Sequence, residues 1–259
     1  LELAGIPLYA KDRTGLQGIV YAGGVCTVNP EPLADFFDFF SVGEGEESTV
    51  EILELYDRAK SEGWSKDAFL QEVSKIPGIY VPSLYEVTYK EDGTIKERKT
   101  LTVDAPEMIM KEMVTDVSDT YYPMKPVVAF IKVTQDRVVL EIQRGCIRGC
   151  RFCQAGQLYR PVRERNLEFL KKYAIAMLEN TGHEEISLSS LSSSDYSQLP
   201  ELIDFLIEEC SRRKINISLP SLRIDAFSLD VMNKVQDVRK SSLTFAPEAG
   251  SQRLRNVIN

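Results

Sequence analysis

The chain has a single histidine and a single tryptophan among 259 residues, and no run of 18 or more apolar residues. A membrane-spanning helix needs about 20 mostly apolar residues, so the sequence predicts no membrane span. The first residues also lack the charged and then apolar pattern of a secretory leader. We therefore expect a cytoplasmic chain without a membrane partner.

Positive charge is in deficit as well. Lysine and arginine total 31 against 39 aspartates and glutamates, which gives a net charge of −8 and a pI near 5.0. A broad basic face for nucleic acid is therefore not implied, although a local one stays open. Six arginines crowd one short segment and predict either a solvated basic loop or a positive pocket. They are Arg144, Arg148, Arg151, Arg160, Arg163 and Arg165.

The first part of the chain alternates short apolar runs with helical spacing. Runs at 19–22 and 37–42 end in glycines, and residues 49–75 carry helical spacing that Gly63 interrupts. This order predicts the last strands of a doubly wound α/β unit. Because Leu1 stands in what reads as the end of a helix, we expect a fragment.

The middle of the chain reads as a connection. Residues 76–101 alternate apolar and polar side chains around Asp92 and Gly93, a dipeptide that favours a β-hairpin turn. Residues 102–126 contain several prolines and predict a linker.

A regular alternation of strands and helices begins at residue 127. Three helices are predicted: one that follows Asn166, one over residues 197–214, and one that follows Ser228. This rhythm predicts a parallel sheet that bends toward a β/α barrel, with its chemistry at the carboxyl ends of the strands. The predicted strands are 138–142, 185–191, 216–222 and 242–248.

The five cysteines are odd in number and three of them are clustered, which fits a secreted disulfide framework poorly. Cys146, Cys150 and Cys153 form a C-x3-C-x2-C array, and no fourth cysteine or histidine lies close to them in the sequence. A structural zinc site normally has four ligands, whereas an iron–sulfur cluster can be held by three thiolates with one iron left open. Two alternatives stay open: a zinc-stabilised, non-catalytic binding module, and an iron–sulfur electron-transfer protein.

The longer string "RGCIRGCRFCQAGQLYRPVRER", with Phe152 just before the last cysteine, resembles the signature of radical S-adenosylmethionine enzymes. Other segments, among them "NPEPLADFFD", "GEGEE" and "APEAGSQRLRNVIN", resemble a narrower bacterial set that has an N-terminal cobalamin-binding-like domain. The resemblance implies an α/β chain in three parts. They are the end of a Rossmann-like, cobalamin-binding-type domain (1–60), a helical and β-hairpin linker (61–126) and a partial radical SAM barrel with strands one to four of an expected six (127–259).

The resemblance also implies an activity and a ligand set. Cys146, Cys150 and Cys153 would hold a [4Fe–4S] cluster that cleaves S-adenosylmethionine to a 5′-deoxyadenosyl radical, with an electron donor such as flavodoxin or ferredoxin. The substrate stays open, with methyl transfer and the modification of RNA or a cofactor among the candidates. Cobalamin is a candidate too, although the Asp-x-His-x-x-Gly loop that supplies a cobalt ligand is absent from these residues. The implied cofactor contacts are Phe152, Asp195, Arg223 and Glu248.

Overall fold

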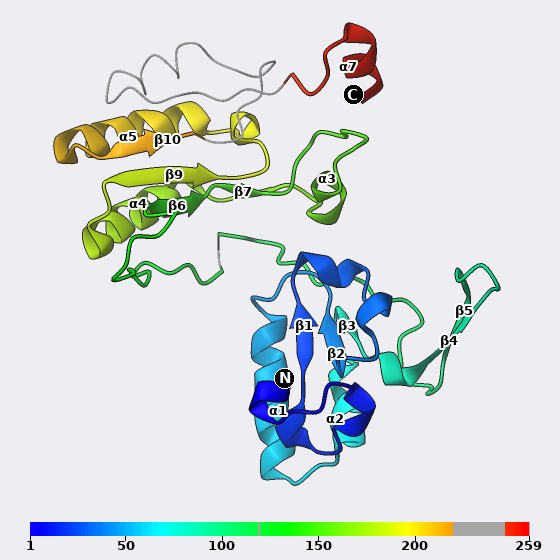
Figure 1. Ribbon diagram of the computed structural model, residues 1–259. Helices are drawn as coiled ribbons and strands as arrows, with labels where there is room; N and C mark the ends of the chain where they lie inside the picture. The colour runs from blue at the N-terminus through cyan, green and yellow to red at the C-terminus, as the bar shows by residue number, and fades with distance from the viewer. Residues whose placement is uncertain (119, 220–246, 259) are drawn as a thin grey trace. The chain divides into compact units, whose positions relative to one another are not determined.

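A computed structural model of the chain describes residues 1–118, 120–219 and 247–258 (Figure 1). The chain divides into two compact units, Leu1–Val114 and Thr115–Asn259. Each unit has a hydrophobic core of its own. In the described residues, no helix combines the length and the apolar composition needed to cross a bilayer.

The first unit is built on a small mixed sheet with the strand order β1-β2-β3. Strands β1 and β2 run parallel, and β3 pairs antiparallel with β2. Two helices lie in the region of predicted helical spacing, and Gly63, with a φ of 69°, interrupts them as predicted, while the side chain of Ser65 caps the second helix. The bounds are β1 (Tyr21–Gly23), β2 (Phe39–Ser41), α1 (Ser48–Ser61), α2 (Lys66–Val73) and β3 (Ile79–Tyr80).

The core of the first unit extends well beyond residue 60, where the sequence predicted a domain boundary. Phe69, Val73 and Ile79 are almost fully buried against Phe39 of β2. The segment predicted as a linker also joins this unit, because Glu112 exchanges backbone hydrogen bonds of 2.8 and 2.9 Å with the chain that follows β2. Because apolar side chains of α2 and β3 are buried in this core and Glu112 pairs with the chain after β2, the first unit ends at Val114 and not near residue 60.

The predicted β-hairpin is confirmed. Strands β4 (Tyr85–Tyr89) and β5 (Ile95–Thr100) pair antiparallel and project from the first unit (Figure 1). Asp92 fixes the turn, because its carboxylate accepts hydrogen bonds from the backbone N–H and the hydroxyl of Thr94.

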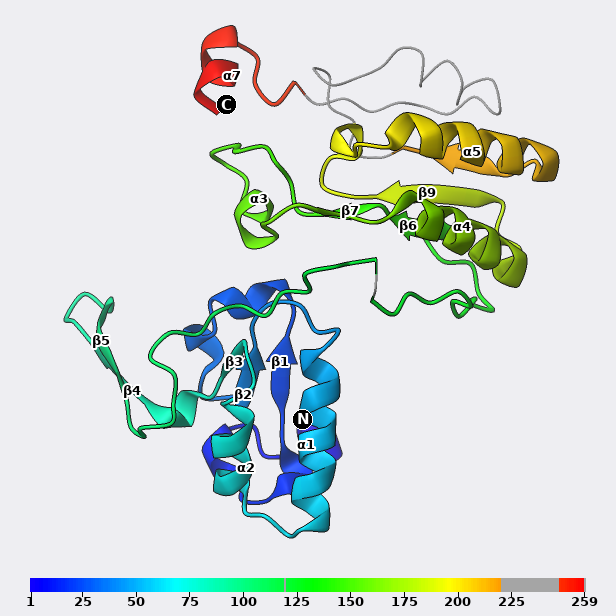
Figure 2. The same ribbon diagram turned by 180° about the vertical axis from the view of Figure 1, so that it is seen from behind.

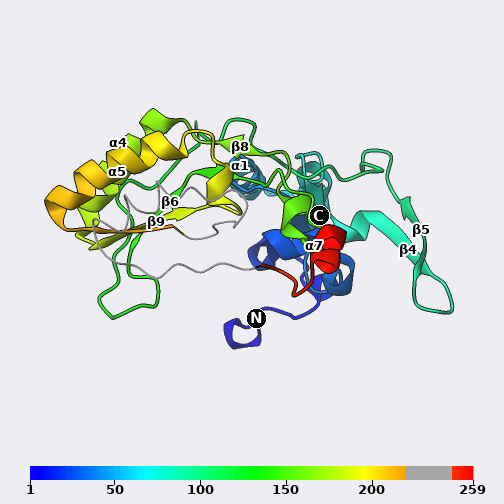
Figure 3. The same cartoon turned by 90° about the horizontal axis from the view of Figure 1, so that it is seen from above.

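The second unit contains a parallel sheet with the strand order β10-β9-β6. Two helices, α4 and α5, lie together on one face of this sheet (Figures 2 and 3). The bounds are β6 (Val138–Glu141), β7 (Gln143–Arg144), α3 (Ala155–Leu158), β8 (Arg163–Glu164), α4 (Leu167–Thr181), β9 (Glu185–Ser189), α5 (Leu199–Arg213), β10 (Asn216–Ser218) and α7 (Gln252–Ile258). Short 3-10 helices lie at Glu2–Ala4, Ala10–Asp12, Leu16–Gly18, Val25–Val28, Glu31–Leu33, Pro82–Leu84 and Ser193–Asp195.

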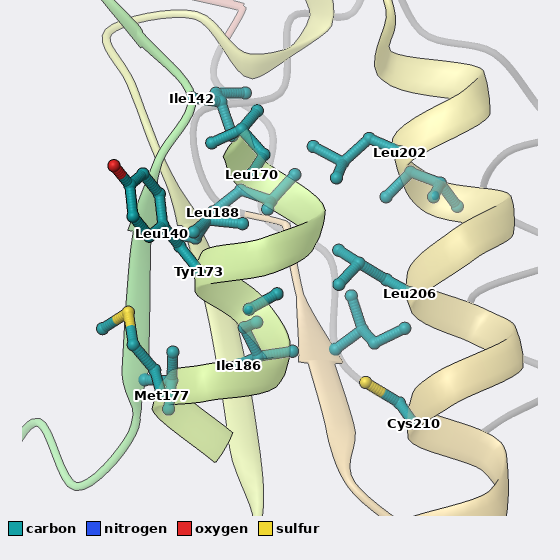
Figure 4. Packing of buried hydrophobic residues seen from close by; sticks show 14 of the residues in the cluster. Leu140, Ile142, Leu170, Tyr173, Met177, Ile186, Leu188, Leu202, Leu206 and Cys210 are labelled. Carbon is teal, nitrogen blue, oxygen red and sulfur yellow. The ribbon is translucent and has the colours of Figure 1, made fainter. Parts of the chain in front are cut away.

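Local sequence signals explain α4, and side-chain packing explains its position. Asn166 caps the helix by accepting from the N–H of Glu168 at 2.8 Å, and Gly182 ends it in the left-handed conformation, both as predicted. Figure 4 shows side chains of α4 and α5 meeting over the sheet, with Leu206 and Cys210 pointing into the same core.

The predicted parallel α/β arrangement is therefore present in the described part of the second unit. The predicted strand at 242–248 falls almost wholly outside the described residues, as do the helix after Ser228 and the candidate contact Arg223.

Candidate cysteine-loop site

A short antiparallel ribbon closes the cysteine-containing loop at its base. Strand β7 leads into the loop and β8 leads out of it, with Gln143 opposite Glu164 and Arg144 opposite Arg163. The backbone N–H of Arg165 adds a 2.9 Å hydrogen bond to the carbonyl of Ile142. The two ends of the loop, residues 145–162, are thereby held together directly after β6.

Gly145 gives the loop its entry conformation. Its φ is 91°, a value that favours glycine. A Cβ at this position would stand 2.5 Å from the carbonyl oxygen of Tyr159 and 2.9 Å from that of Pro161. The incoming and outgoing chain therefore approach so closely that no other residue fits beside Cys146.

The three clustered cysteines lie partly exposed on this loop. The N–H of Arg148 donates to the Sγ of Cys146, and the N–H of Gly156 donates to the Sγ of Cys153, both at 3.4 Å. Within residues 1–118, 120–219 and 247–258, no three or more His, Cys, Asp or Glu side chains form a group that could hold a metal ion. The three thiols are therefore not gathered into a metal-binding group in the described residues, and no four-ligand zinc site is formed there either.

An ion pair joins the cysteine loop to the loop after β9. Arg148, between the first two cysteines, donates to both carboxylate oxygens of Asp195, with 3.0 Å from Nε to Oδ2. The Asp195 side chain is only 7% exposed. Gln143 adds a second connection, since its Nε2 donates to the carbonyl of Ser192 at 2.7 Å. The loops that follow β6 and β9 therefore meet at the carboxyl edge of the parallel sheet.

A buried arginine supports the base of the loop. The guanidinium of Arg165 lies 2.6 Å from the carboxylate of Glu141 and 4.8 Å from the ring centroid of Tyr122. Arg144 also binds the Glu141 carboxylate, at 3.0 Å. Burial acts to raise the pKa of Glu141, but the two arginines outweigh it and hold the pKa below its usual value.

The arginine cluster is thus partly neutralised by acids from outside its own segment. Arg144 and Arg165 bind Glu141, and Arg148 binds Asp195. The sequence predicted either a solvated basic loop or a positive pocket, because Glu164 is the one acid within that span.

The structure brings one of the predicted cofactor contacts to the cysteines. Asp195 lies against the loop through Arg148, whereas Phe152 is 59% exposed on the loop itself. Glu248 is exposed and has a φ of 62°, and among the described residues its side chain forms no hydrogen bond or ion pair with the loop. The end of α7 does reach the loop, because the N–H of Arg151 donates to the carbonyl of Ile258 at 3.0 Å.

The donor set fits an iron–sulfur cluster in its chemistry. Such clusters are held by cysteine thiolates, and N–H groups that donate to sulfur tune them. Cys146, Cys150 and Cys153 share one loop whose ends are fixed, and two of the three sulfurs already receive N–H donors. The fit rests on these donors and on the loop, and not on the distances between the sulfurs.

The fold and the site together define a class of protein: an α/β chain that carries three thiols on a closed loop at the carboxyl edge of a parallel sheet. Family models agree with it: one described as "Radical SAM proteins, N-terminal" matches residues 1–82, and one described as "Radical SAM superfamily" matches residues 140–259. The chain belongs to the radical SAM superfamily.

The chain is also similar to a protein from Methanocaldococcus jannaschii named "Uncharacterized protein MJ0966". The two are 32% identical over 243 residues, which cover 93% of this chain and 45% of the relative. This chain therefore spans less than half the length of that relative.

Two solved structures of TsrM from Kitasatospora setae, a radical S-adenosylmethionine methyltransferase, are distantly similar. One holds cobalamin and a [4Fe–4S] cluster; it is 11% identical with a TM-score of 0.49, over 86% of this chain and 41% of that chain. The other holds tryptophan and a SAM analogue; it is 15% identical with a TM-score of 0.39, over 85% of this chain and 36% of that chain. Likeness at this level carries no argument about function.

Proposed function

We propose that this protein is a radical SAM enzyme in which Cys146, Cys150 and Cys153 hold a [4Fe–4S] cluster. The observation that supports the proposal is the closed loop that carries three thiols and pairs Arg148 with Asp195, within the residues that match the superfamily. When bound, the cluster and S-adenosylmethionine would together supply a 5′-deoxyadenosyl radical.

The residues of the chain would position and shield that chemistry. Asp195 supplies a carboxylate at the edge of the sheet, suited to the amino group of the cofactor's methionyl part. Arg148 orients this carboxylate by binding both of its oxygens. Arg223 and Glu248 would complete the polar contacts, and Phe152 would cover the cofactor from the loop.

The first unit belongs to the same proposal as the end of a Rossmann-like domain of the cobalamin-binding type. Its parallel β1 and β2 end at Gly23 and Ser41, and Gly24, with a φ of 96° and nothing within 4 Å of a Cβ built on it, leaves backbone open to a ligand after β1. Methyl transfer would follow if cobalamin binds there, and flavodoxin or ferredoxin would supply the electron. Modification of RNA or of a cofactor is the other reaction class in the proposal.

Anaerobic reconstitution with iron and sulfide tests the ligand assignment. We expect about four irons per chain, a brown absorbance and 5′-deoxyadenosine on reduction with S-adenosylmethionine. Cys150→Ala should lose most of the iron, whereas the matched control Cys26→Ala, which changes an exposed cysteine of the first unit, should keep it. Equal iron in the two variants would overturn the ligand assignment, and stoichiometric zinc without brown absorbance would overturn the proposal in favour of the zinc-stabilised module.

A further inference from the structure

The first unit contains a cleft of about 770 Å³, and none of its lining residues belongs to the cysteine loop. Its volume lies within the roughly 300–1,000 Å³ range of small-molecule sites. Its walls include four tyrosines, and its lining comes entirely from the first unit.

The cleft lies at the edge of the sheet opposite to the strand ends that an α/β unit normally offers to a ligand. Asp38 lines the cleft and immediately precedes β2, while Tyr80 lines it and ends the antiparallel β3. Phe40 of β2 pairs with Tyr80. Gly24 and Gly43 follow the carboxyl ends of β1 and β2, at the other edge.

The cleft is also lined by a buried ion cluster whose charges pair with one another. Asp38 lies 3.0 Å from the Nε of Arg13 and 2.6 Å from the Nζ of Lys66. The remaining nitrogens of Arg13 donate to three backbone carbonyls, and Lys66 donates to two more at 2.7 Å. These cations are therefore committed to the fold and are not available to an anionic ligand.

The carboxylates at the walls of the cleft, unlike Asp38, form no ion pair with a lysine or arginine of the described residues. They are Glu31, Asp35 and Asp67. Glu31 accepts from the hydroxyls of Tyr80 and Tyr89, but a carboxylate can accept about four hydrogen bonds. Negative charge is thus present at the walls with acceptor capacity left.

The tyrosine rings favour the same kind of ligand. Aromatic faces attract cations, and two rings of this cleft already do so within the chain. The Nζ of Lys11 lies 5.6 Å from the ring centroid of Tyr9, and the guanidinium carbon of Arg98 lies 4.9 Å from that of Tyr85. Tyr89, which stands beside Glu31, is 53% exposed and presents a further ring.

We propose that this cleft binds an organic cation, a guanidinium or ammonium group on an aliphatic stem, with Glu31 and Tyr89 as its principal contacts. Burial of the charged head against the carboxylate supplies the ion pair, and the ring covers the stem. The proposal does not depend on the iron–sulfur cluster or on S-adenosylmethionine.

Calorimetry on the whole chain with a matched pair of probes tests it. N-acetylarginine amide carries the cation, N-acetylcitrulline amide is its neutral isostere, and inorganic phosphate is the anionic probe. We expect the arginine compound alone to bind, with affinity about tenfold weaker in Glu31→Gln and about threefold weaker in Tyr89→Leu. Glu54→Gln, an exposed change on α1 away from the cleft, should bind as the wild type does.

Agmatine, which has the guanidinium but no peptide groups, distinguishes a small free amine from an arginine side chain on a polypeptide; tighter binding of either form supports the site. Equal binding of the citrulline compound, preference for phosphate, or no arginine binding at millimolar concentration would overturn it. Circular dichroism of each variant shows whether the fold is kept, and Tyr89→Leu tests the site even if Glu31→Gln does not fold.

Discussion

Replacing Gly145 with alanine should destabilise the second unit and impair loading of the cysteine loop. The left-handed backbone costs a non-glycine residue about 1–2 kcal/mol, and forcing a methyl group into a packed site costs about 1–3 kcal/mol more. The second cost applies here because the added Cβ would lie 2.5 Å from a backbone oxygen of Tyr159, which is not a flexible side-chain end. The total of roughly 2–5 kcal/mol would lower the melting midpoint by about 5–15 °C.

Gly182→Ala is the matched control. This glycine also has a positive φ, 70°, but nothing lies within 4 Å of a Cβ built on it, so only the backbone cost of about 1–2 kcal/mol applies. Far-UV circular dichroism measures unfolding of both units, while fluorescence of Trp64 reports the first unit alone. We expect Gly145→Ala to lower the dichroism midpoint and the bound iron but to leave the Trp64 transition in place. Equal midpoints and equal iron in the two variants would refute the steric argument.

Two further predictions concern charge at the loop. Arg148→Ala removes the bidentate partner of Asp195, so reconstituted protein should lose iron to a chelator about tenfold faster than the wild type. Arg148→Lys should be intermediate, because lysine keeps the charge but not the bidentate geometry. An unchanged rate of iron loss in both variants would count against a positioning role for Arg148. The lowered pKa of Glu141 means that its stabilising contribution is fully present above its ordinary pKa, about 4.3, and is lost as the pH falls through the lower folded value. Urea midpoints of wild type and Glu141→Gln should therefore differ at pH 7 and converge in acid, whereas a constant difference would contradict the electrostatic cause.

Elements with short-range signals were predictable from the sequence. The α4 helix follows from the capping side chain of Asn166, from apolar residues on one face, and from a glycine stop at Gly182. The β4–β5 hairpin follows from Asp92 in its turn. In each case the signal lies within a few residues of the element that it specifies, so propensity and hydrogen bonding act locally.

Features that depend on long-range contacts were not predictable in this way. Arg148 and Asp195 lie 47 residues apart, and nothing in either segment identifies the partner. The same holds for Arg165, which appeared as one more basic loop residue and is instead buried against Glu141. The extent of the first unit was also missed, because burial of Phe69 is decided by the sheet that it covers.

The cysteine loop was found from spacing alone, but its closure was not. The β7–β8 ribbon is only two residues long on each side, too short to produce a periodic pattern. Gly145 carried a usable signal, a glycine directly before the first cysteine, whose purpose is evident only from the crowding around it.

The same ribbon has a consequence for metal capture. The β7–β8 ribbon holds both ends of the cysteine loop together and so lowers the conformational entropy of the loop before a metal binds. Less entropy is then lost when the thiols ligate a metal. Under the proposed ligation, loosening the ribbon should therefore weaken iron binding without altering a single sulfur.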